Sequence, residues 1–378
     1  MINETEPSLF AELPQALVEE MLAKSTDIGD GVVKSFREVK KKKKEIRKQL
    51  KREDLLTDER YYPSKVPTTC GVDGAFAVEQ LLSLDLVACA AVAVEGLAPP
   101  KEKSYWVEPH HTVFFSKTGH SPDNGTILKG LMAKMEVELA SFAPHDVVFL
   151  DGSFTSPLIA MNQAVNKVIE QDKEEEIYDQ ICDQFGGFLE SFETILKSEN
   201  RIWASIPKYT SKKELSSKFN WSIGYDDRAI LTTILEPGDV VKPIKLAKPD
   251  QPWHLRSLAT YAEIKRQVYA ALNDLYVMYY RPSSKVPALR VEIASSVAND
   301  EAKIALLLKA LQYQSVGPAI IEPFPLYLAD RKVKHLSTGV STIRHASTRQ
   351  MTEMREPIHE KEKDMETIFF LMHNYRTD

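Results

Sequence analysis

Cysteine is scarce in this sequence. Only Cys70, Cys89 and Cys182 occur among 378 residues, and they lie far apart. A disulfide framework needs an even set of cysteines in a short chain, and a structural zinc site needs about four clustered ligands. The sequence therefore excludes both kinds of site and favours a reducing, cytoplasmic setting.

Long uncharged apolar runs are also missing. The longest apolar stretch, residues 84–98, is interrupted by Asp85 and Glu95, whereas a membrane-spanning helix needs about 20 apolar residues. Residues 1–15 hold no basic segment followed by an apolar one, so we expect no secretory signal there. The expected protein is cytoplasmic and makes no membrane contact.

A phosphate-binding P-loop of the form GxxxxGK[ST] does not occur anywhere in the chain. Such a loop cradles the phosphates of a bound nucleotide with its backbone N–H groups. The chain is therefore not itself a P-loop ATPase, and any ATP-driven step must come from a partner.

The composition does provide material for a large core, since 43% of the residues are hydrophobic, and the formal charge is only −6. One segment departs from this balance: residues 34–52, KSFREVKKKKKEIRKQLKR, hold eleven Lys or Arg and two Glu. Helical spacing of its apolar residues predicts a basic helical arm outside the core. Its lysines either form a solvated helix face or bind nucleic-acid phosphates, and the candidates for the second role are Lys40, Lys41, Lys42, Lys43 and Lys44.

Strand and helix patterns alternate along the rest of the chain. Strands are expected at 70–80, 84–98, 104–116, 146–154, 201–207, 272–282 and 288–295, and helices at 126–142, 154–198, 300–315 and from 324. Residues 236–253 are rich in Pro and Lys and are expected to form a loop or insertion. This order predicts an α/β fold with a mixed sheet flanked by helices, in which residues 1–60 form an N-terminal helical region and residues 61–378 form the main domain.

Two of the expected strands carry the same chemical pattern, an apolar run that leads into Asp-Gly. The pairs are Asp73-Gly74 and Asp151-Gly152. If the strands are neighbours, both carboxylates lie at one edge of the sheet, where their repulsion calls for a hard cation such as Mn²⁺ or Mg²⁺. A metal held there could serve phosphodiester hydrolysis. Asp-Gly is also a common turn dipeptide, and this interpretation stays open.

These two motifs, in this order around a helix with Glu136 and Glu138, resemble the NurA family of DNA end-resection nucleases. The likeness is carried by GVDGAF, MEVELA and VVFLDGSF and extends over residues 68–338. Family members have an RNase H-like core and work with the HerA hexameric translocase. The resemblance thus implies an RNase H-like mixed sheet, a nuclease that uses Mn²⁺ or Mg²⁺, DNA as the substrate, a HerA-type ATPase as the partner and a homodimer.

The resemblance also implies roles for single residues. Asp73 and Asp151 match the family's two metal-binding aspartates. The intervening glutamate falls on Glu136 or Glu138, and we prefer Glu136, although the apolar stripe of the helix does not choose between them. Lys208 follows a strand and is expected either to hold the scissile phosphate in catalysis or to be a solvated loop lysine.

The C-terminal motif departs from the family pattern. Members usually carry a tyrosine before a proline and a histidine after an alanine, and this chain has Glu322 and Asp330 at those positions. Either these carboxylates hold metal in the same register, or Tyr327 and His335 act in a shifted one. We prefer the unshifted register, which adds Asp330 to the metal-binding and catalytic set, because carboxylates suit a hard cation.

Two further expectations concern supporting residues. Arg290 and Glu292 alternate on one strand, so they point to the same face and are expected to form an ion pair. Asp227 is expected to cap the helical turn that follows it.

The leading functional hypothesis is a metal-dependent deoxyribonuclease that resects or degrades DNA ends made accessible by a translocating ATPase, in DNA repair or in antiviral defence. The altered motif at Glu322 and Asp330 keeps a rival open, an adaptor of the same fold that docks on the motor and binds DNA. An RNA or Holliday-junction nuclease would share the metal chemistry and differ in the shape of the substrate.

Overall fold

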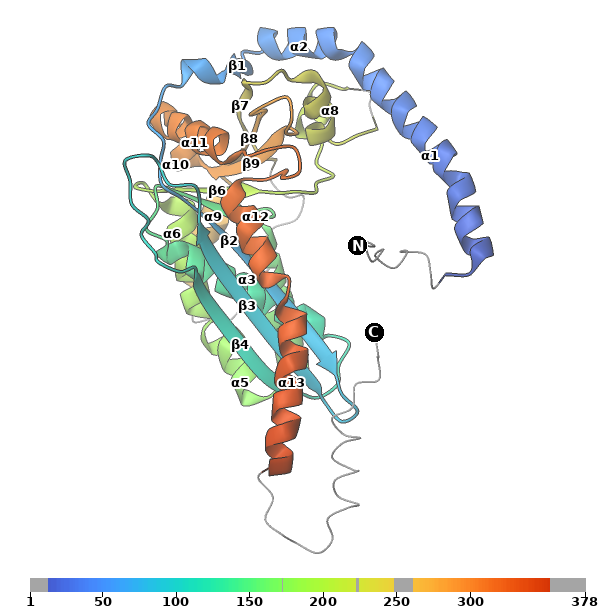
Figure 1. Ribbon diagram of the computed structural model, residues 1–378. Helices are drawn as coiled ribbons and strands as arrows, with labels where there is room; N and C mark the ends of the chain where they lie inside the picture. The colour runs from blue at the N-terminus through green and yellow to red at the C-terminus, as the bar shows by residue number, and fades with distance from the viewer. Residues whose placement is uncertain (1–12, 172, 222–223, 248–260, 354–378) are drawn as a thin grey trace, which may run out of the picture.

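The predicted strands join one mixed sheet in the order β1-β7-β8-β9-β6-β5-β2-β3-β4 (Figure 1). The structure is a computed structural model and describes residues 13–171, 173–221, 224–247 and 261–353. The strands are β1 Leu56–Asp58, β2 Thr69–Gln80, β3 Asp85–Glu95, β4 His110–Thr118, β5 Val147–Asp151, β6 Ile202–Ile206, β7 Asp239–Lys245, β8 Leu275–Tyr280 and β9 Leu289–Ala294. The predicted α/β class with a mixed sheet is confirmed.

Helices cover both faces of this sheet. They are α1 Gln15–Lys41, α2 Lys43–Arg52, α3 Asn124–Phe142, α4 Ser156–Gln171, α5 Glu175–Tyr178, α6 Phe185–Lys197, α7 Glu214–Lys218, α8 Asp227–Ile234, α9 Ala262–Leu272, α10 Ser295–Ala298, α11 Glu301–Gln314, α12 Phe324–Val333 and α13 Leu336–Glu353. Helix α3 packs on β2 and β3 and is backed by α4 and α6, whereas α12 and α13 cross β2 and β3 on the opposite face (Figure 1). In the described part of the chain, no helix is long and apolar enough to span a membrane.

The register of the central strands positions the site. β2, β5 and β6 are parallel neighbours, and the β2–β5 ladder runs to the pair Val72 and Leu150. Asp73 and Asp151 are the next residues of these strands, so they lie side by side. In the β5–β6 ladder Asp151 pairs with Ile206, so the segment with Lys208 leaves the sheet at the same edge.

Alternating residues of β5 enter two different cores. Val148 and Leu150 pack with α3 and α6, and Val147 and Phe149 pack with α11 and Leu326 of α12. A strand buried on both faces has a continuous apolar run, as is usual in parallel sheets. Asp151 is the first polar residue after this apolar run. Strand alternation directs its side chain to the same face of the sheet as Val147 and Phe149.

The expectation of a loop or insertion at residues 236–253 is wrong for part of that segment. Residues Asp239–Lys245 form β7, which pairs with β1 and β8 inside the sheet. The register shifts between Val241 and Ile244, and Pro243 lies within this irregularity, where a missing backbone N–H is tolerated. Residues 248–253 lie outside the described residues.

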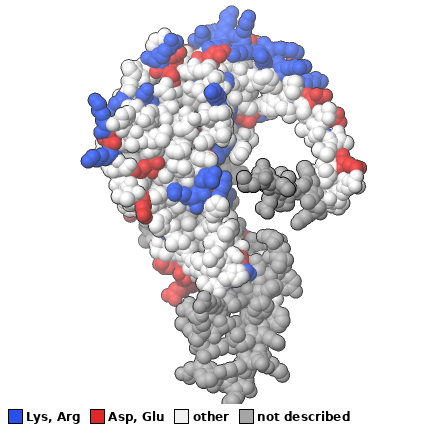
Figure 2. Space-filling view, viewed as in Figure 1, with Lys and Arg blue, Asp and Glu red and all other residues white. Residues whose placement is uncertain are grey.

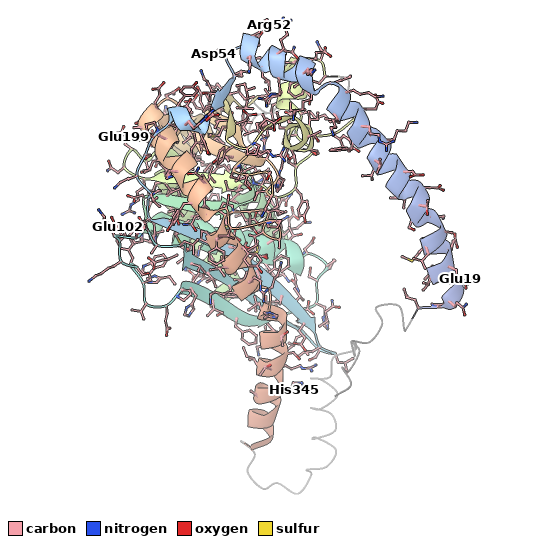
Figure 3. All side chains as sticks on the ribbon, turned by 45° about the horizontal axis from the view of Figure 1, so that its top comes forward. Glu19, Arg52, Asp54, Glu102, Glu199 and His345 are labelled. Atoms are coloured by element: carbon pink, nitrogen blue, oxygen red, sulfur yellow. The ribbon has the colours of Figure 1, made fainter. Side chains whose placement is uncertain are left out.

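The expectation that the basic arm lies wholly outside the core is also wrong. The predicted helices are present as α1 and α2, but Val39, Ile46 and Leu50 are buried in a core shared with α8 and β8. Arg47 adds an ion pair with Asp239 of β7. The inner end of the arm is therefore part of the fold, and α1 runs outward from it to Glu19 (Figures 1 and 3).

Candidate active site

Each Asp-Gly motif holds its carboxylate with a hydrogen bond from the backbone that follows. The N–H of Gly74 donates to Asp73 Oδ1 at 2.9 Å, and the N–H of Gly152 donates to Asp151 Oδ1 at 2.8 Å. Gly152 has a φ of 74°, a conformation that favours glycine. The turn interpretation therefore holds at Gly152, and this turn leaves Asp151 at the sheet edge beside Asp73.

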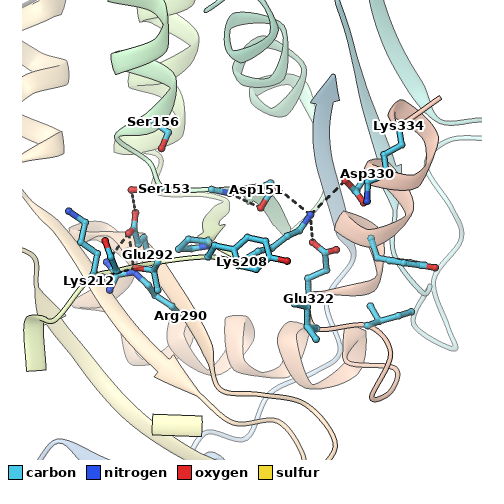
Figure 4. A pocket seen from close by; sticks show the side chains of 18 of the residues that line it. Asp151, Ser153, Ser156, Lys208, Lys212, Arg290, Glu292, Glu322, Asp330 and Lys334 are labelled. Carbon is cyan, nitrogen blue, oxygen red and sulfur yellow. Dashed lines mark hydrogen bonds and ion pairs between the residues drawn. The ribbon is translucent and has the colours of Figure 1, made fainter. Parts of the chain in front are cut away.

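The ammonium of Lys208 lies among three carboxylates (Figure 4). Its Nζ is 3.2 Å from Asp151 Oδ2, 3.0 Å from Glu322 Oε2 and 3.9 Å from Asp330 Oδ1. Asp330 also pairs with Lys334 at 2.5 Å. Lys208 is thus not a solvated loop lysine, since its side chain is only 17% exposed.

Helix α3 brings a further carboxylate to the same place. A Cβ at Gly74 would lie 2.7 Å from Glu136 Oε1, so the missing side chain of Gly74 allows Glu136 to approach the strand. Glu138 instead forms an ion pair with Lys134 at 3.3 Å. The geometry therefore separates the two glutamates and brings Glu136 toward Asp73 and Asp151.

Burial and mutual repulsion shift the pKa values of these groups. Burial, followed by the charge of Asp151, raises the pKa of Asp73 to about 7. Burial and the charges of Asp73 and Asp151 raise the pKa of Glu136 well above its ordinary value. Burial alone would lower the pKa of Lys208, but the surrounding carboxylates outweigh it and raise that pKa. The cluster therefore holds more negative charge than its own lysine balances.

Close approach of α12 to β2 brings in the residues of the C-terminal motif. A Cβ at Gly71 would lie 2.4 Å from the backbone of Pro325 and Leu326, so α12 crosses the strand at this glycine. The crossing places Glu322, just before α12, and Asp330, on it, beside Lys208.

The residues of the shifted register lie differently. Tyr327 lines the cleft, and its hydroxyl accepts a hydrogen bond from Arg331 at 3.2 Å. His335 is exposed beyond the end of α12 and does not line the cleft. The unshifted pair is thus the one that the fold brings to the carboxylate cluster.

A cleft of about 720 Å³ opens onto this cluster. Asp151, Glu322 and Asp330 line it near Lys208, and Ser156 and Lys212 line it farther from Glu322 and Asp330 (Figure 4). Asp73 and Glu136 are not lining residues. Asp73 is 7% exposed, whereas the side chain of Asp151 is 30% exposed.

The turn after Asp151 is supported by a buried acid that the sequence did not point to as a site residue. Glu292 Oε2 accepts from Ser153 Oγ at 2.7 Å and from the N–H of Phe154 at 3.1 Å. Arg290 Nη2 donates to Glu292 Oε1 at 2.9 Å, which confirms the predicted ion pair. Strand alternation predicts that pair, but only the tertiary structure shows the contact with residues 153–154.

Asp227 does cap a helix, but not the following one. It accepts from the N–H groups of Leu215 and Ser216 at 2.6 and 2.9 Å and so caps α7, which precedes it in sequence. Asp226 caps α8 through the N–H of Ala229 at 3.0 Å. Neither residue lines the cleft.

The donor set fits a hard divalent cation. Among the described residues, no three Asp, Glu, His or Cys side chains close on one point tightly enough to hold a metal ion as they stand. The Nζ of Lys208 instead lies between the carboxylates, in the place where a cation balances them. Carboxylate oxygens are the ligands that Mn²⁺ and Mg²⁺ prefer, and the raised pKa values of Asp73 and Glu136 mean that a further cation would favour their ionised forms.

The lysines of the basic arm lie apart from the cleft. Lys40, Lys41 and Lys44 are exposed, and Lys43 pairs with Glu236 near the start of β7. Blue atoms crowd over α2 and the inner end of α1 in Figure 2. None of Lys40–Lys44 lines the cleft.

Comparisons with known proteins agree on one family. The model of the NurA domain matches residues 67–335. The NurA nuclease structure from Sulfolobus solfataricus has a TM-score of 0.58 at 15% identity, covering 91% of this chain and 100% of that chain. A structure of NurA with manganese has a TM-score of 0.55 at 12% identity, covering 88% of this chain and 99% of that chain. A structure of NurA bound to dAMP and manganese has a TM-score of 0.53 at 13% identity, covering 82% of this chain and 93% of that chain. No curated protein sequence matches significantly.

Proposed function

The chain belongs to the NurA family, and we propose that it is a metal-dependent deoxyribonuclease that resects or degrades DNA ends together with a HerA-type hexameric ATPase. The observation that carries the proposal is the gathering of carboxylates from β2, β5 and the α12 motif around Lys208, with Glu136 of α3 next to Asp73 and Asp151. The process served is DNA repair or antiviral defence. The bound dAMP and manganese of one similar structure support a nucleotide substrate and a divalent metal.

In this proposal the carboxylates bind the metal for phosphodiester hydrolysis. Asp73, Glu136, Asp151 and Asp330 would hold Mn²⁺ or Mg²⁺, and Glu322 is placed to add negative charge beside them. A bound divalent cation activates water and stabilises the leaving oxygen.

The chain's own groups supply the positioning. Lys208 lies within reach of the carboxylates on the wall of the cleft, where its ammonium can bind a non-bridging phosphate oxygen once the metal neutralises the acids. The turn at Gly152, held through Ser153 and Phe154 by Glu292, keeps Asp151 at the sheet edge.

Three partners complete the proposal. DNA phosphates would contact Lys40–Lys44 on the arm, a HerA-type ATPase would supply translocation because the chain has no P-loop, and a second copy of this chain would form a homodimer.

The test is cleavage of linear DNA by the purified chain, with Mn²⁺ or with EDTA, in the presence and absence of its motor. We expect Mn²⁺-dependent cleavage that Asp151→Asn reduces at least about 1,000-fold. The matched control is Glu138→Gln, a carboxylate of α3 paired with Lys134, which should cleave like the wild type. Cleavage retained in Asp151→Asn would contradict the site, and a wild type that binds the motor and DNA without cleaving would establish the adaptor instead.

A further inference from the structure

The cleft is not lined by charged residues alone. Tyr209, Ile320 and Ile321 also line it. Tyr209 is 88% exposed, so its ring is open to solvent although it directly follows Lys208 in the chain. An open aromatic ring in a cleft is the kind of surface on which an unpaired nucleic-acid base stacks.

The segment between Lys208 and Lys212 is held at both ends. Arg228 donates through Nη1 to the carbonyl of Lys208, and the N–H of Asp227 donates to the carbonyl of Lys212 at 3.0 Å. Both donors belong to the first turn of α8, so one rigid element fixes the two ends of the segment. The exposure of Tyr209 therefore follows from a fixed backbone path, and little conformational freedom would be lost when the ring binds a ligand.

The two lysines that end this segment have different surroundings (Figure 4). Lys208 pairs with Asp151 and Glu322. Lys212 also lines the cleft but is exposed, and among the described residues no carboxylate pairs with its ammonium. The segment thus offers an ammonium at each end, and the one at Lys212 is free to bind an anion.

This order of groups matches the repeat of a nucleic-acid strand. Phosphates alternate with nucleosides along a strand, so a ring between two ammonium groups meets a base while the ammonium groups meet the flanking phosphates. Every base has a π-face, so stacking on Tyr209 would not depend on the sequence of the strand. In a duplex the neighbouring base pairs cover both faces of a base, and only an unpaired nucleotide presents a face without the cost of unstacking.

We propose that Tyr209 stacks on the base next to the scissile phosphate and that Lys212 binds the phosphate on the other side of that nucleotide. This assignment rests on the proposed function, in which Lys208 binds the scissile phosphate. It names the form of substrate that the cleft accepts, a strand that is unpaired at this nucleotide. Tyr209 is then a specificity-determining residue that selects unpaired DNA and not a particular base.

The first experiment maps the cuts made with Mn²⁺ in a single-stranded oligonucleotide that carries one abasic site. The wild type should cut the bond beside the missing base about tenfold less often than the same bond of the intact strand. Tyr209→Ala should cut that bond equally often in both strands, and Tyr209→Phe, which keeps the ring, should behave like the wild type. Cut frequencies are compared within each digest, so the result does not depend on total activity.

The matched control is Tyr61→Ala, because Tyr61 is also exposed, at 77%, but does not line the cleft. This variant should avoid the bond beside the abasic site as the wild type does. A wild type that cuts there at the intact frequency, or a Tyr209→Ala that still avoids the bond, overturns the stacking.

The second experiment measures binding in EDTA, where metal-dependent cleavage cannot occur. Fluorescence anisotropy gives the affinities for a normal strand and for a strand of the same length without any bases. The preference of the wild type for the normal strand should fall about tenfold in Tyr209→Ala. An equal preference in the two proteins overturns the stacking.

The same assay tests the phosphate contact of Lys212. Lys212→Gln should weaken binding of both strands equally and make the slope of log affinity against log salt shallower by about 0.7, the value for one phosphate of a single strand. Lys213→Gln is the control, since Lys213 donates to the carbonyl of Gly224 and does not line the cleft. An unchanged slope in Lys212→Gln overturns this contact.

The two experiments separate this inference from the nuclease itself. A wild type that cuts no strand contradicts the proposed function, and the binding preference in EDTA then decides the stacking. A Tyr209→Ala that binds and cuts every strand like the wild type, but is no longer stimulated by the HerA-type ATPase, assigns the ring to the motor and overturns the stacking.

Discussion

Charge balance is the dominant physical feature of the candidate site at the scale of single residues. The carboxylates on β2, α3, β5 and α12 come from distant parts of the sequence, and folding brings them together against their repulsion. Lys208 compensates part of this charge, and the raised pKa values of Asp73 and Glu136 show that the compensation is incomplete. The folded site therefore carries excess negative charge that attracts cations.

Replacing the internal cation tests this balance. Lys208→Met should lower the stability of the metal-free protein by about 1–3 kcal/mol at pH 8, because unpaired buried charges are costly. It should also increase the rise in melting temperature that Mn²⁺ produces, since no ammonium then competes for the carboxylates. Thermal denaturation with and without Mn²⁺ measures both effects. Lys212→Met, farther from Glu322 and Asp330 in the cleft (Figure 4), is the control, and equal responses of the two variants would contradict the role of Lys208.

The raised pKa of Asp73 makes the metal-free stability depend on pH. A carboxyl whose folded pKa is about 7 is penalised only when ionised, so the penalty is absent below its unfolded pKa of about 3.9 and complete above about 7. Stability is therefore lost as the pH rises through this window. Asp73→Asn removes the penalty and should stabilise the EDTA-treated protein by about 4 kcal/mol at pH 8, with little effect at pH 4. Urea denaturation at both pH values measures the difference, and an equal effect at both would show that the ionisation of Asp73 is not the cause.

Sequence patterns could predict Asp151, because an Asp-Gly at the end of an apolar strand is visible without a structure. Asp73 carries the same pattern, but it lies inside β2, which continues to Gln80. Sequence patterns could also predict the Arg290–Glu292 pair, which depends only on strand alternation. They could not choose between Glu136 and Glu138, because that choice depends on the open space at Gly74. The contact of Glu292 with residues 153–154 joins positions 139 apart in sequence, and no local pattern encodes it.

At the scale of elements, the site depends on two helices that cross β2 on opposite faces. α3 approaches at Gly74 and α12 at Gly71, and at both positions a side chain on the strand would collide with the helix. Alternation along β2 directs residues 71 and 74 to opposite faces, so one strand receives acids from both sides. Helix and strand periodicity predict these elements, but the crossing points follow from where the glycines allow close contact.

Adding one methyl group at the α12 crossing tests this arrangement. The Cβ of Gly71→Ala would meet backbone atoms of Pro325 and Leu326, which no rotamer change relieves. We expect a stability decrease of about 1–3 kcal/mol and at least about tenfold slower cleavage, because α12 carries Asp330. Gly187→Ala in α6, where a Cβ meets open space, should keep wild-type cleavage. Chemical denaturation and cleavage rates are compared at a temperature where both variants are folded, and wild-type cleavage by Gly71→Ala would show that the crossing does not position the site.

The prediction of a loop at residues 236–253 failed because it relied on composition and did not account for burial in the folded protein. Pro and Lys in residues 236–253 are typical of a loop, but Val240 and Val241 enter the cores on the two faces of β7. The paired strands β1 and β8 supply the hydrogen bonds that hold this segment in the sheet. Long-range pairing therefore overrides a local preference, and the sequence holds only a weak sign of it in the two adjacent valines.

At the scale of the whole molecule, charge is divided between the arm and the body. Residues 34–52 hold eleven of the 48 Lys and Arg and two of the 54 Asp and Glu, although the chain has a formal charge of −6. Burial of Val39, Ile46 and Leu50 anchors this positive segment on the body. A polyanion is therefore attracted to one end of the molecule and repelled by much of the remaining surface.

Neutralising the arm should change binding without changing the chemistry. With Lys40–Lys44 replaced by Gln, affinity for long duplex DNA should fall, and the slope of log affinity against log salt should become shallower by about 0.9 for each DNA phosphate that the arm no longer neutralises. Cleavage of a short oligonucleotide that reaches only the cleft should stay at the wild-type rate, because no lysine of this set lines it. Replacing the exposed Lys101 and Lys103 by Gln removes positive charge elsewhere and should leave the slope unchanged. Fluorescence anisotropy over a range of salt concentrations gives both slopes, and equal slopes for the arm variant and the wild type would assign the arm to the motor or to solvent rather than to DNA.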